Sequence, residues 1–133
     1  MDEQSLKDLE ELADADGRYA KAAYLFIYGA LQYTVEKLGK ESLPKQQRHV
    51  SGQDLVQALS EYGMDQFGPL TASVFEHWGV QETRDFGEIV FNLVGANLMS
   101  KTEDDCIEDF TNVYNFDDEF DWKKRRAEFK RGA

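Results

Sequence analysis

The chain has 133 residues, of which 41% are hydrophobic and 13% aromatic, and it carries a net charge of −11. This length fits one domain with its own hydrophobic core, the aromatic content excludes a disordered protein, and the charge disfavours attraction to DNA, RNA or anionic lipid. A single cysteine, Cys106, excludes an intramolecular disulfide. The sequence shows no long apolar run and no basic leader, which predicts a cytoplasmic protein without a membrane partner.

The first part of the chain predicts an acidic helix followed by a long buried one. Residues 5–13 place three leucines on one side of a helix, and residues 19–38 carry apolar side chains at three- and four-residue spacing up to Gly39. The second helix is apolar around much of its circumference. It is therefore either central to the fold, which is the favoured interpretation, or shared with a partner. Tyr24 and Tyr28, on its second face, are candidate partner-binding residues.

Three further helices are predicted in the middle of the chain. Ser51 is expected to cap the first of them, and a Gly-Pro break follows it at residues 68–69. The second helix is short and ends at Gly79. Thr83 is expected to cap the third, which has the strongest apolar stripe of the chain and ends near Asn97.

The segment after this helix predicts a small β-hairpin, with strands at residues 98–101 and 110–116 joined by a polar turn. Helices followed by a hairpin in this order are typical of winged-helix proteins. We therefore predict a mainly α single domain with a small β-hairpin and a winged-helix-like order. Its expected parts are an acidic N-terminal helix or arm at residues 1–17, a globular domain at residues 18–116 and a charged C-terminal tail at residues 117–133.

The charge pattern argues against a nucleic-acid surface on the third of these helices. Its outward side is expected to offer two acids and two amides: Asp85, Glu88, Asn92 and Asn97. A helix that reads DNA needs basic and amide side chains, with Lys and Arg around it for the phosphates, and here Arg84 lies at the start of the helix. Between residues 85 and 121 there are eleven acids against one base, Lys101, so this surface would repel a polyanion.

The C-terminal tail is the alternative site for nucleic acid. Its acids come first and its bases second, and the basic part contains Lys123, Lys124, Arg125 and Arg126 beside Trp122. These four residues are candidates for contact with RNA, DNA or a ribosome, and equally with a protein partner. The favoured interpretation is a solvated helix whose bases are neutralised by the neighbouring acids.

Patterns for catalysis or metal binding have weak support. Glu76 and His77 are the candidates for an enzymatic site, although a partly buried structural histidine is the favoured interpretation. No H-E-x-x-H spacing and no calcium-loop pattern is present, so we predict no metal, no cofactor and no catalytic residue. The acids around Cys106 suppress its thiolate. The glycines punctuate helices instead of forming a phosphate-binding loop: Gly63, Gly68, Gly79, Gly87 and Gly95.

At five short segments the chain resembles a family of uncharacterised bacterial proteins known mainly from planctomycetes and verrucomicrobia. The segments are HVSGQDL, QFGP, EHWGV, DFGEIVFNLV and SKTEDD, and the similarity covers residues 18–120. The resemblance implies a bacterial cytosolic protein. It transfers no catalytic or binding residue.

The sequence as a whole predicts a small non-catalytic protein–protein interaction domain with an unidentified protein partner, and it is compatible with a homo-oligomer. The first alternative is an RNA-, DNA- or ribosome-associated protein that uses its basic C-terminal tail. The second alternative is a small enzyme around His77.

Overall fold

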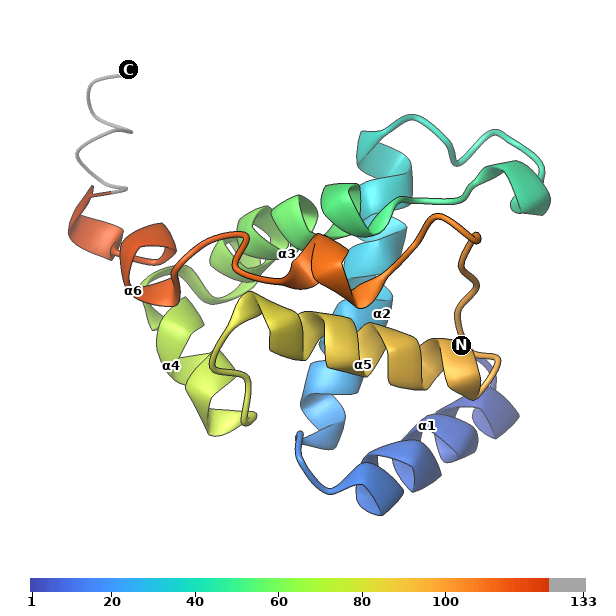
Figure 1. Cartoon of the computed structure of the whole chain (residues 1–133), viewed down its shortest axis with the longest axis horizontal. Helices are drawn as coiled ribbons and strands as arrows, with labels where there is room; N and C mark the ends of the chain where they lie inside the picture. Colours follow the sequence, from blue (N-terminus) through green and yellow to red (C-terminus); the bar gives the residue numbers. More distant parts are fainter. Residues whose placement is uncertain (125–133) are drawn as a thin grey trace.

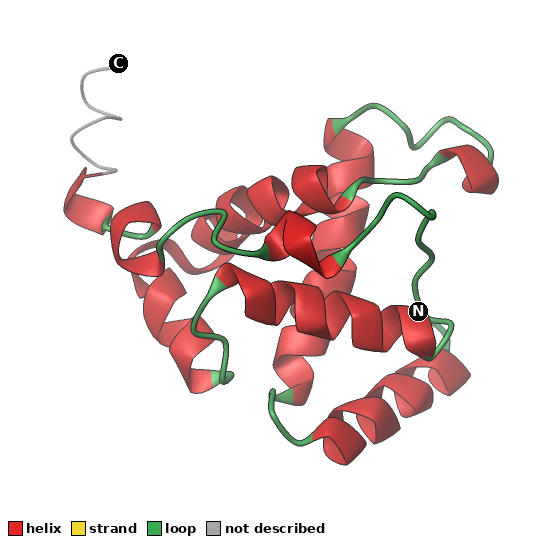
Figure 2. Ribbon diagram, viewed as in Figure 1, coloured by secondary structure: helices red, strands yellow, loops and turns green. Residues whose placement is uncertain are grey.

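The computed structural model describes residues 1–124 of the chain, and helices make up the regular structure of this part (Figure 1, Figure 2). The α-helices are, in chain order, α1 (Glu3–Asp16), α2 (Lys21–Lys37), α3 (Gly52–Phe67), α4 (Thr71–His77), α5 (Thr83–Gly95) and α6 (Phe116–Glu119). Short 3-10 turns lie between them: η1 (Lys45–Gln47), η2 (Gly68–Leu70) and η3 (Ile107–Phe110). None of the described helices combines the length and the apolarity needed to cross a bilayer.

Helix α2 is central, as its wide apolar surface predicts. It packs against α1, α3 and α5, and Figure 1 shows it passing behind α5. The side chains that it buries come from much of its circumference: Ala23, Tyr24, Phe26, Ile27, Ala30, Thr34 and Val35. A helix of this kind needs neighbours on several sides, and here the protein itself provides them.

A connected cluster of aromatic rings fills the core beside α2. Phe75 of α4 lies at its centre, fully buried, with ring centroids 5.3 Å from both Phe86 and Phe120 and 5.4 Å from Phe26. Edge-to-face pairs of this kind contribute about 0.5–1.5 kcal/mol each beyond the area that they bury. The other rings of the cluster are Tyr33, Tyr62, Phe67, Trp78, Tyr114 and Phe116. The short helix α4 is therefore anchored by one central side chain.

Several predicted helix ends are confirmed. The hydroxyl of Ser51 accepts a hydrogen bond from the backbone N of Asp54 at 3.0 Å and so begins α3. Gly39 and Gly79 follow α2 and α4 in the left-handed region, with φ of 69° and 87°. At Gly79 a side chain is excluded twice, because a Cβ would also lie 2.5 Å from the carbonyl oxygen of Arg18.

The predicted cap of α5 is wrong. Glu82 is the N-cap residue, and Oδ2 of Asp85 accepts hydrogen bonds from the backbone N atoms of Gln81 and Glu82, at 2.9 and 3.2 Å. Thr83 is buried, and its Oγ1 accepts a hydrogen bond from the backbone N of Val113 at 3.2 Å. Its hydroxyl therefore holds the returning C-terminal segment instead of closing the end of the helix.

The predicted β-hairpin is also wrong, since no strand occurs among residues 1–124. The apolar side chains after α5 enter the core one at a time. Phe110 packs against Gly87 of α5, and the hydroxyl of Tyr114 donates a hydrogen bond to the backbone O of Val56 at 2.7 Å. Because these residues contact helices, they need no strand partner. Without a wing, the winged-helix-like order has no support.

The core reaches beyond the limits of the predicted globular domain, residues 18–116. Leu9 of α1 and Phe120 after α6 are both buried with it. Helix α1 begins two residues earlier than predicted because Oδ1 of Asp2 accepts a hydrogen bond from the backbone N of Ser5 at 2.7 Å. Of the predicted tail, residues 125–133 lie outside the described range.

Candidate functional site

The polar side of α5, which the sequence predicts to face outwards, forms hydrogen bonds with other parts of the protein. Oδ1 of Asp85 accepts a hydrogen bond from the hydroxyl of Tyr19 at 2.6 Å. Nδ2 of Asn92 donates to the hydroxyl oxygen of Tyr24 at 3.1 Å. Both tyrosines belong to α2 or to the turn before it. This side of α5 therefore joins α2 and is not a free surface for nucleic acid.

Arg18 extends this polar contact to the turn between α1 and α2. Its guanidinium lies 3.0 Å from Oδ1 of Asp16 and 3.6 Å from Oε2 of Glu88 on α5. The hydrogen bond from Arg18 lowers the pKa of the Asp16 carboxyl below its usual value. The Arg18 side chain is 49% exposed, so these ion pairs are screened by water and each is weak.

Burial raises the pKa of four tyrosine hydroxyls among the described residues, those of Tyr19, Tyr24, Tyr33 and Tyr114. Burial is the main cause for Tyr19, with the hydrogen bond to Asp85 adding to it, and burial is again the largest cause for Tyr24 and Tyr114. A hydroxyl of this kind stays protonated at neutral pH. A general acid or base works best with a pKa near the working pH, so these groups act as structural donors.

Of the two tyrosines predicted to bind a partner, Tyr24 is enclosed by the protein's own core. Its side chain is 0% exposed, and its hydroxyl lies within hydrogen-bond distance of Asn92 and Asp16. A fully enclosed ring offers no area to another protein. Tyr28, one turn further along α2, is half-buried and keeps its place as a candidate.

Glu76 and His77 end α4 and are both exposed. The prediction of a partly buried His77 is wrong because Phe75 points into the core and the residue two positions later lies on the far side of the helix. No hydrogen bond or ion pair joins the side chain of His77 to another residue of the described range. The two side chains are thus adjacent on the surface, without a third group that would orient the imidazole.

The predicted basic residues are only partly within the described range. Lys123 and Lys124 are exposed at its end, whereas Arg125 and Arg126 lie beyond it. Elsewhere, Lys37 forms an ion pair with Glu61, and Nζ of Lys40 donates a hydrogen bond to the backbone O of His49. Lys37 and Lys40 are therefore held by contacts within the protein.

No group of three or more His, Cys, Asp or Glu side chains within residues 1–124 is arranged to hold a metal ion. The nearest approach is a contact of two residues, in which Nε2 of His49 lies 2.9 Å from Oδ2 of Asp105. Nε2 is buried and poorly aligned for a hydrogen bond, so the contact is an ion pair only when the imidazole is protonated. It joins the loop before α3 to the loop after α5.

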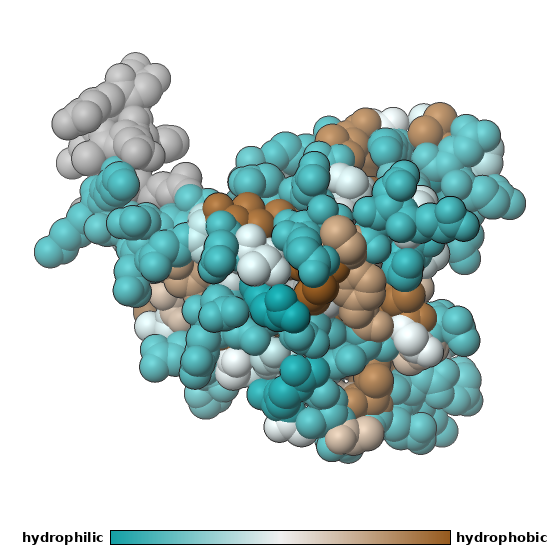
Figure 3. Space-filling view, viewed as in Figure 1, coloured by the Kyte–Doolittle hydropathy of each residue, from teal (hydrophilic) through white to brown (hydrophobic). Residues whose placement is uncertain are grey.

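An acidic strip runs along the C-terminal segment. It consists of the exposed carboxylates within residues 103–121: Glu103, Asp104, Glu108, Asp117, Asp118 and Asp121. The segment crosses the face seen in Figure 1, where η3 packs on α3 and α5, and Figure 3 shows this face as largely hydrophilic. No Lys or Arg of the described residues forms an ion pair with any of the six. The strip is therefore an uncompensated negative surface within this part of the chain.

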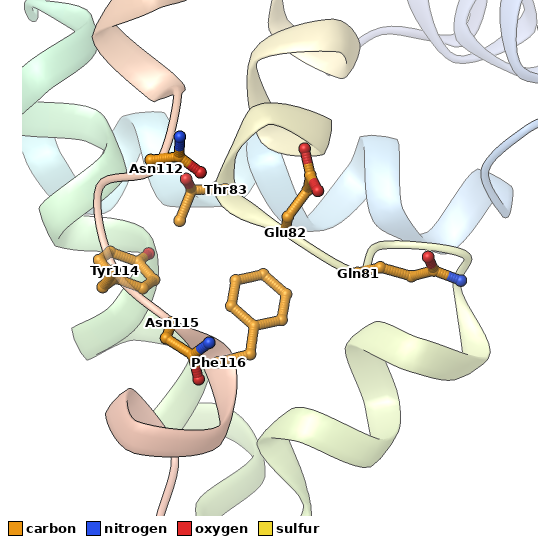
Figure 4. A pocket seen from close by; sticks show the side chains of 7 residues that line it. All are labelled: Gln81, Glu82, Thr83, Asn112, Tyr114, Asn115 and Phe116. Atoms are coloured by element: carbon orange, nitrogen blue, oxygen red, sulfur yellow. The ribbon is translucent and has the colours of Figure 1, made fainter.

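A cleft of about 350 Å³ lies between the turn that precedes α5 and the segment that leads into α6 (Figure 4). Its lining contains one carboxylate, three amides, a threonine and two aromatic rings, and no base: Gln81, Glu82, Thr83, Asn112, Tyr114, Asn115 and Phe116. In Figure 4 the ring of Phe116 lies next to the segment that carries Glu82 and Thr83. The cleft is thus polar, with one aromatic wall.

Sequence patterns do not point to this cleft, because its walls come from segments that α5 and η3 separate. The hydrogen bond from Val113 to Thr83 brings the two segments together. The signal that the sequence does contain is the pair of amides after η3, Asn112 and Asn115. The backbone of Asn112 is left-handed, with φ of 52°, and Oδ1 of Asn115 accepts hydrogen bonds from the first backbone N–H groups of α6.

Comparisons with models of protein families, with curated proteins and with solved structures found no match. The resemblance to the bacterial family of uncharacterised proteins therefore stays a prediction, and the function is inferred from the geometry and charge of residues 1–124.

Proposed function

We propose that this protein is a small non-catalytic cytoplasmic domain that binds a protein with a basic surface. The observation that carries the proposal is the acidic strip, six exposed carboxylates without a Lys or Arg partner in residues 1–124. Clustered like charges repel one another and oppose the compact state, and a basic partner relieves this repulsion. A charged strip of this kind also speeds the encounter with an oppositely charged surface.

The segment that carries the strip is anchored to the core, which favours a binding surface of fixed shape. Phe110 and Phe120, which lie among the acids in the sequence, are buried in the core. The hydrogen bond from Tyr114 to the backbone O of Val56 ties the same segment to α3. A surface that is ordered before binding loses less conformational entropy when the partner arrives.

The charge also ranks the possible partners. A second copy of the chain is a poor partner for the strip, because the two strips would repel each other. Nucleic acid is disfavoured at the strip for the same reason, and the exposed Lys123 and Lys124 are the described part of the basic tail to which it could bind. The enzyme hypothesis has less support, because the exposed His77 is not among the residues that line the cleft.

The test compares two full-length variants with the same change of charge. The strip variant carries Glu103→Gln, Asp104→Asn, Glu108→Gln and Asp117→Asn. The control variant carries the same types of change at exposed acids elsewhere: Glu3→Gln, Glu11→Gln, Asp14→Asn and Glu41→Gln. Both are used with the unaltered protein to capture partners from nuclease-treated lysate of the source cells, and circular dichroism checks that both variants fold.

We expect a basic protein that is captured by the unaltered chain and by the control variant, and that is released by salt. Exposed charge pairs contribute about 0.2–1 kcal/mol each, so the strip variant should bind this protein about tenfold more weakly. Equal capture by both variants would overturn the proposal. Capture that disappears with nuclease would favour the basic tail and nucleic acid instead.

A further inference from the structure

We propose that the cleft between the turn before α5 and the segment before α6 is a binding site for a primary ammonium group. The ligand would be either a free alkyl amine or the side chain of a lysine on a bound protein. The acidic strip could bind a protein without this cleft, and the cleft could bind an amine without a protein partner. The charge, the hydrogen-bonding groups, the aromatic wall and the volume of the cleft all fit such a ligand.

The charge of the lining selects for a cation. Glu82 contributes a carboxylate, and the described lining holds no Lys, Arg or His. Asp117 and Asp118, in the first turn of α6, follow directly after the lining residues Asn115 and Phe116. An anionic ligand would meet only negative charge here, whereas a cation is attracted by the lining and by its surroundings.

The hydrogen-bonding groups fit an ammonium better than a neutral ligand. An alkyl ammonium has three donors and no acceptor, so it needs several acceptor oxygens in one place. The carboxylate of Glu82 accepts one hydrogen bond from the backbone N of Asp85 and has further acceptor positions, and the amide side chains of Gln81 and Asn112 make no hydrogen bond with another described residue. Their oxygens are therefore available to a ligand, whereas Oδ1 of Asn115 is already occupied by the start of α6.

Phe116 supplies the remaining contact. Its ring is half-buried, packs against the rings of Phe86 and Phe120, and also lines the cleft (Figure 4). The face of an aromatic ring attracts a cation, and the same face packs against the methylene groups of an alkyl chain. An ammonium on a short chain therefore satisfies the polar side and the aromatic side of the cleft together.

The volume and the fixed shape of the cleft limit the ligand to a short chain. A volume of about 350 Å³ lies at the lower end of the usual range for small-molecule sites. The hydrogen bonds from Val113 to Thr83 and from Tyr114 to Val56 hold the wall that carries Asn112. One extended lysine side chain or a short diamine matches this space, and a larger ligand would protrude into solvent.

The experiment is a titration of the isotope-labelled full-length protein, followed through its backbone amide NMR signals. Three probes are added in turn: cadaverine as a free amine, Nα-acetyl-lysine methylamide as a lysine side chain, and 1-pentanol as a neutral chain. We expect saturable shifts at Gln81, Asn112 and Phe116 with an amine and none with the alcohol. Saturation with the lysine derivative assigns the site to a partner's lysine, and saturation with cadaverine alone assigns it to a free amine.

Two variants and a control make the result specific. Glu82→Gln removes the charge with little change of shape, and Asn112→Gly removes the amide at a position whose left-handed backbone suits glycine. Since a hydrogen bond to a charged group is stronger than a neutral one, Glu82→Gln should weaken binding by about tenfold. Glu11→Gln, an exposed acid of α1, should leave the affinity unchanged.

Two outcomes would overturn the proposal: shifts that never saturate with either amine, or an equal weakening by Glu82→Gln and Glu11→Gln, which would indicate attraction to the general negative charge. Amine binding is measured on the unaltered protein and on the Glu82→Gln, Asn112→Gly and Glu11→Gln variants, whereas partner capture is measured on the strip variant and its control. The two proposals are therefore tested on different variants, and either can fail without the other.

Discussion

The hydroxyl of Tyr19 lies 2.6 Å from Oδ1 of Asp85 and donates a hydrogen bond to it, while Oδ2 of the same carboxylate accepts two backbone N–H groups at the start of α5. The side chain of Asp85 therefore accepts the hydrogen bonds of the turn at the N-terminus of α5 and also joins this helix to Tyr19, the residue before the N-cap of α2. All three hydrogen bonds end on an ionised acceptor, and such bonds are stronger than neutral ones.

We expect the loss of this carboxylate to be costly. Asp85→Ala leaves the Tyr19 hydroxyl and two backbone donors without their acceptor, and should lower the free energy of unfolding by about 2–3 kcal/mol. Tyr19→Phe removes only one bond and should cost about 1 kcal/mol. Urea unfolding measures both changes. Asp14→Ala, at an exposed acid of α1, should stay within about 0.5 kcal/mol, and an equally small effect of Asp85→Ala would contradict the assigned role.

Stability should fall in alkaline solution. Burial raises the pKa of Tyr19, Tyr24 and Tyr114 above the usual value of 10, so the folded state holds these protons more tightly than the unfolded state. The resulting stabilisation is complete below pH 10 and is lost as the pH rises above 10, because the unfolded chain then releases protons that the folded chain keeps. Urea unfolding at pH values on both sides of 10 tests this, and Tyr114→Phe should reduce the slope. A stability that does not change across pH 10 would refute it.

Two glycines of the same helix should respond to alanine in opposite directions. A Cβ at Gly87 would lie 2.6 Å from Cδ1 of Ile107 and 2.9 Å from Cβ of Phe110, so Gly87→Ala should destabilise the fold by about 1–3 kcal/mol. At Gly95, the last residue of α5, a Cβ meets nothing within 4 Å, and Gly95→Ala should stabilise the helix by up to about 1 kcal/mol. Thermal unfolding gives both signs, and a stabilising Gly87→Ala would mean that η3 does not press on α5.

The hydroxyl of Thr83 should matter for the C-terminal segment more than for α5. Thr83→Val removes the acceptor of the Val113 backbone N–H, and should cost about 1–2 kcal/mol of unfolding free energy while speeding hydrogen exchange at Val113. Thr83→Ser keeps the hydroxyl and should preserve the slow exchange of that amide. If exchange at Val113 is equally fast in both variants, the hydrogen bond does not hold the segment.

The helices follow from local patterns in the sequence. The apolar spacing of α2 and α3, the cap at Ser51 and the glycines that end α2 and α4 depend on neighbours a few residues away, so they can be recognised without knowing the fold. The segment after α5 has no such regular spacing. Its aromatic side chains each find a different helix, which produces the same irregular apolar run that a short hairpin would show.

The cleft and the polar contacts of α5 depend on residues that are far apart in the sequence. For this reason they could not be predicted from local patterns. Asp85 and Asn92 look exposed on a helical wheel, but each forms a hydrogen bond with a tyrosine that lies much earlier in the sequence, Tyr19 and Tyr24 respectively. Gly87 lies inside a helix, where the sequence alone suggests a break, because Phe110 needs the space that a side chain would fill. The exposed acids, in contrast, could be recognised from composition, since unpaired charge stays at the surface.

The two tryptophans, one inside the aromatic cluster and one outside it, give the protein two optical reporters that sense different regions. The indole of Trp78 is surrounded by Phe26, Phe67 and Phe75, with ring centroids 5.4 to 5.9 Å away. Trp122 is 37% exposed and lies near Gly68, just after α6. Fluorescence from Trp78 therefore follows the integrity of the core, whereas emission from Trp122 is open to a soluble quencher. A Trp122→Phe variant separates the two signals, so that unfolding of the interior and events at the surface can be observed without an added dye.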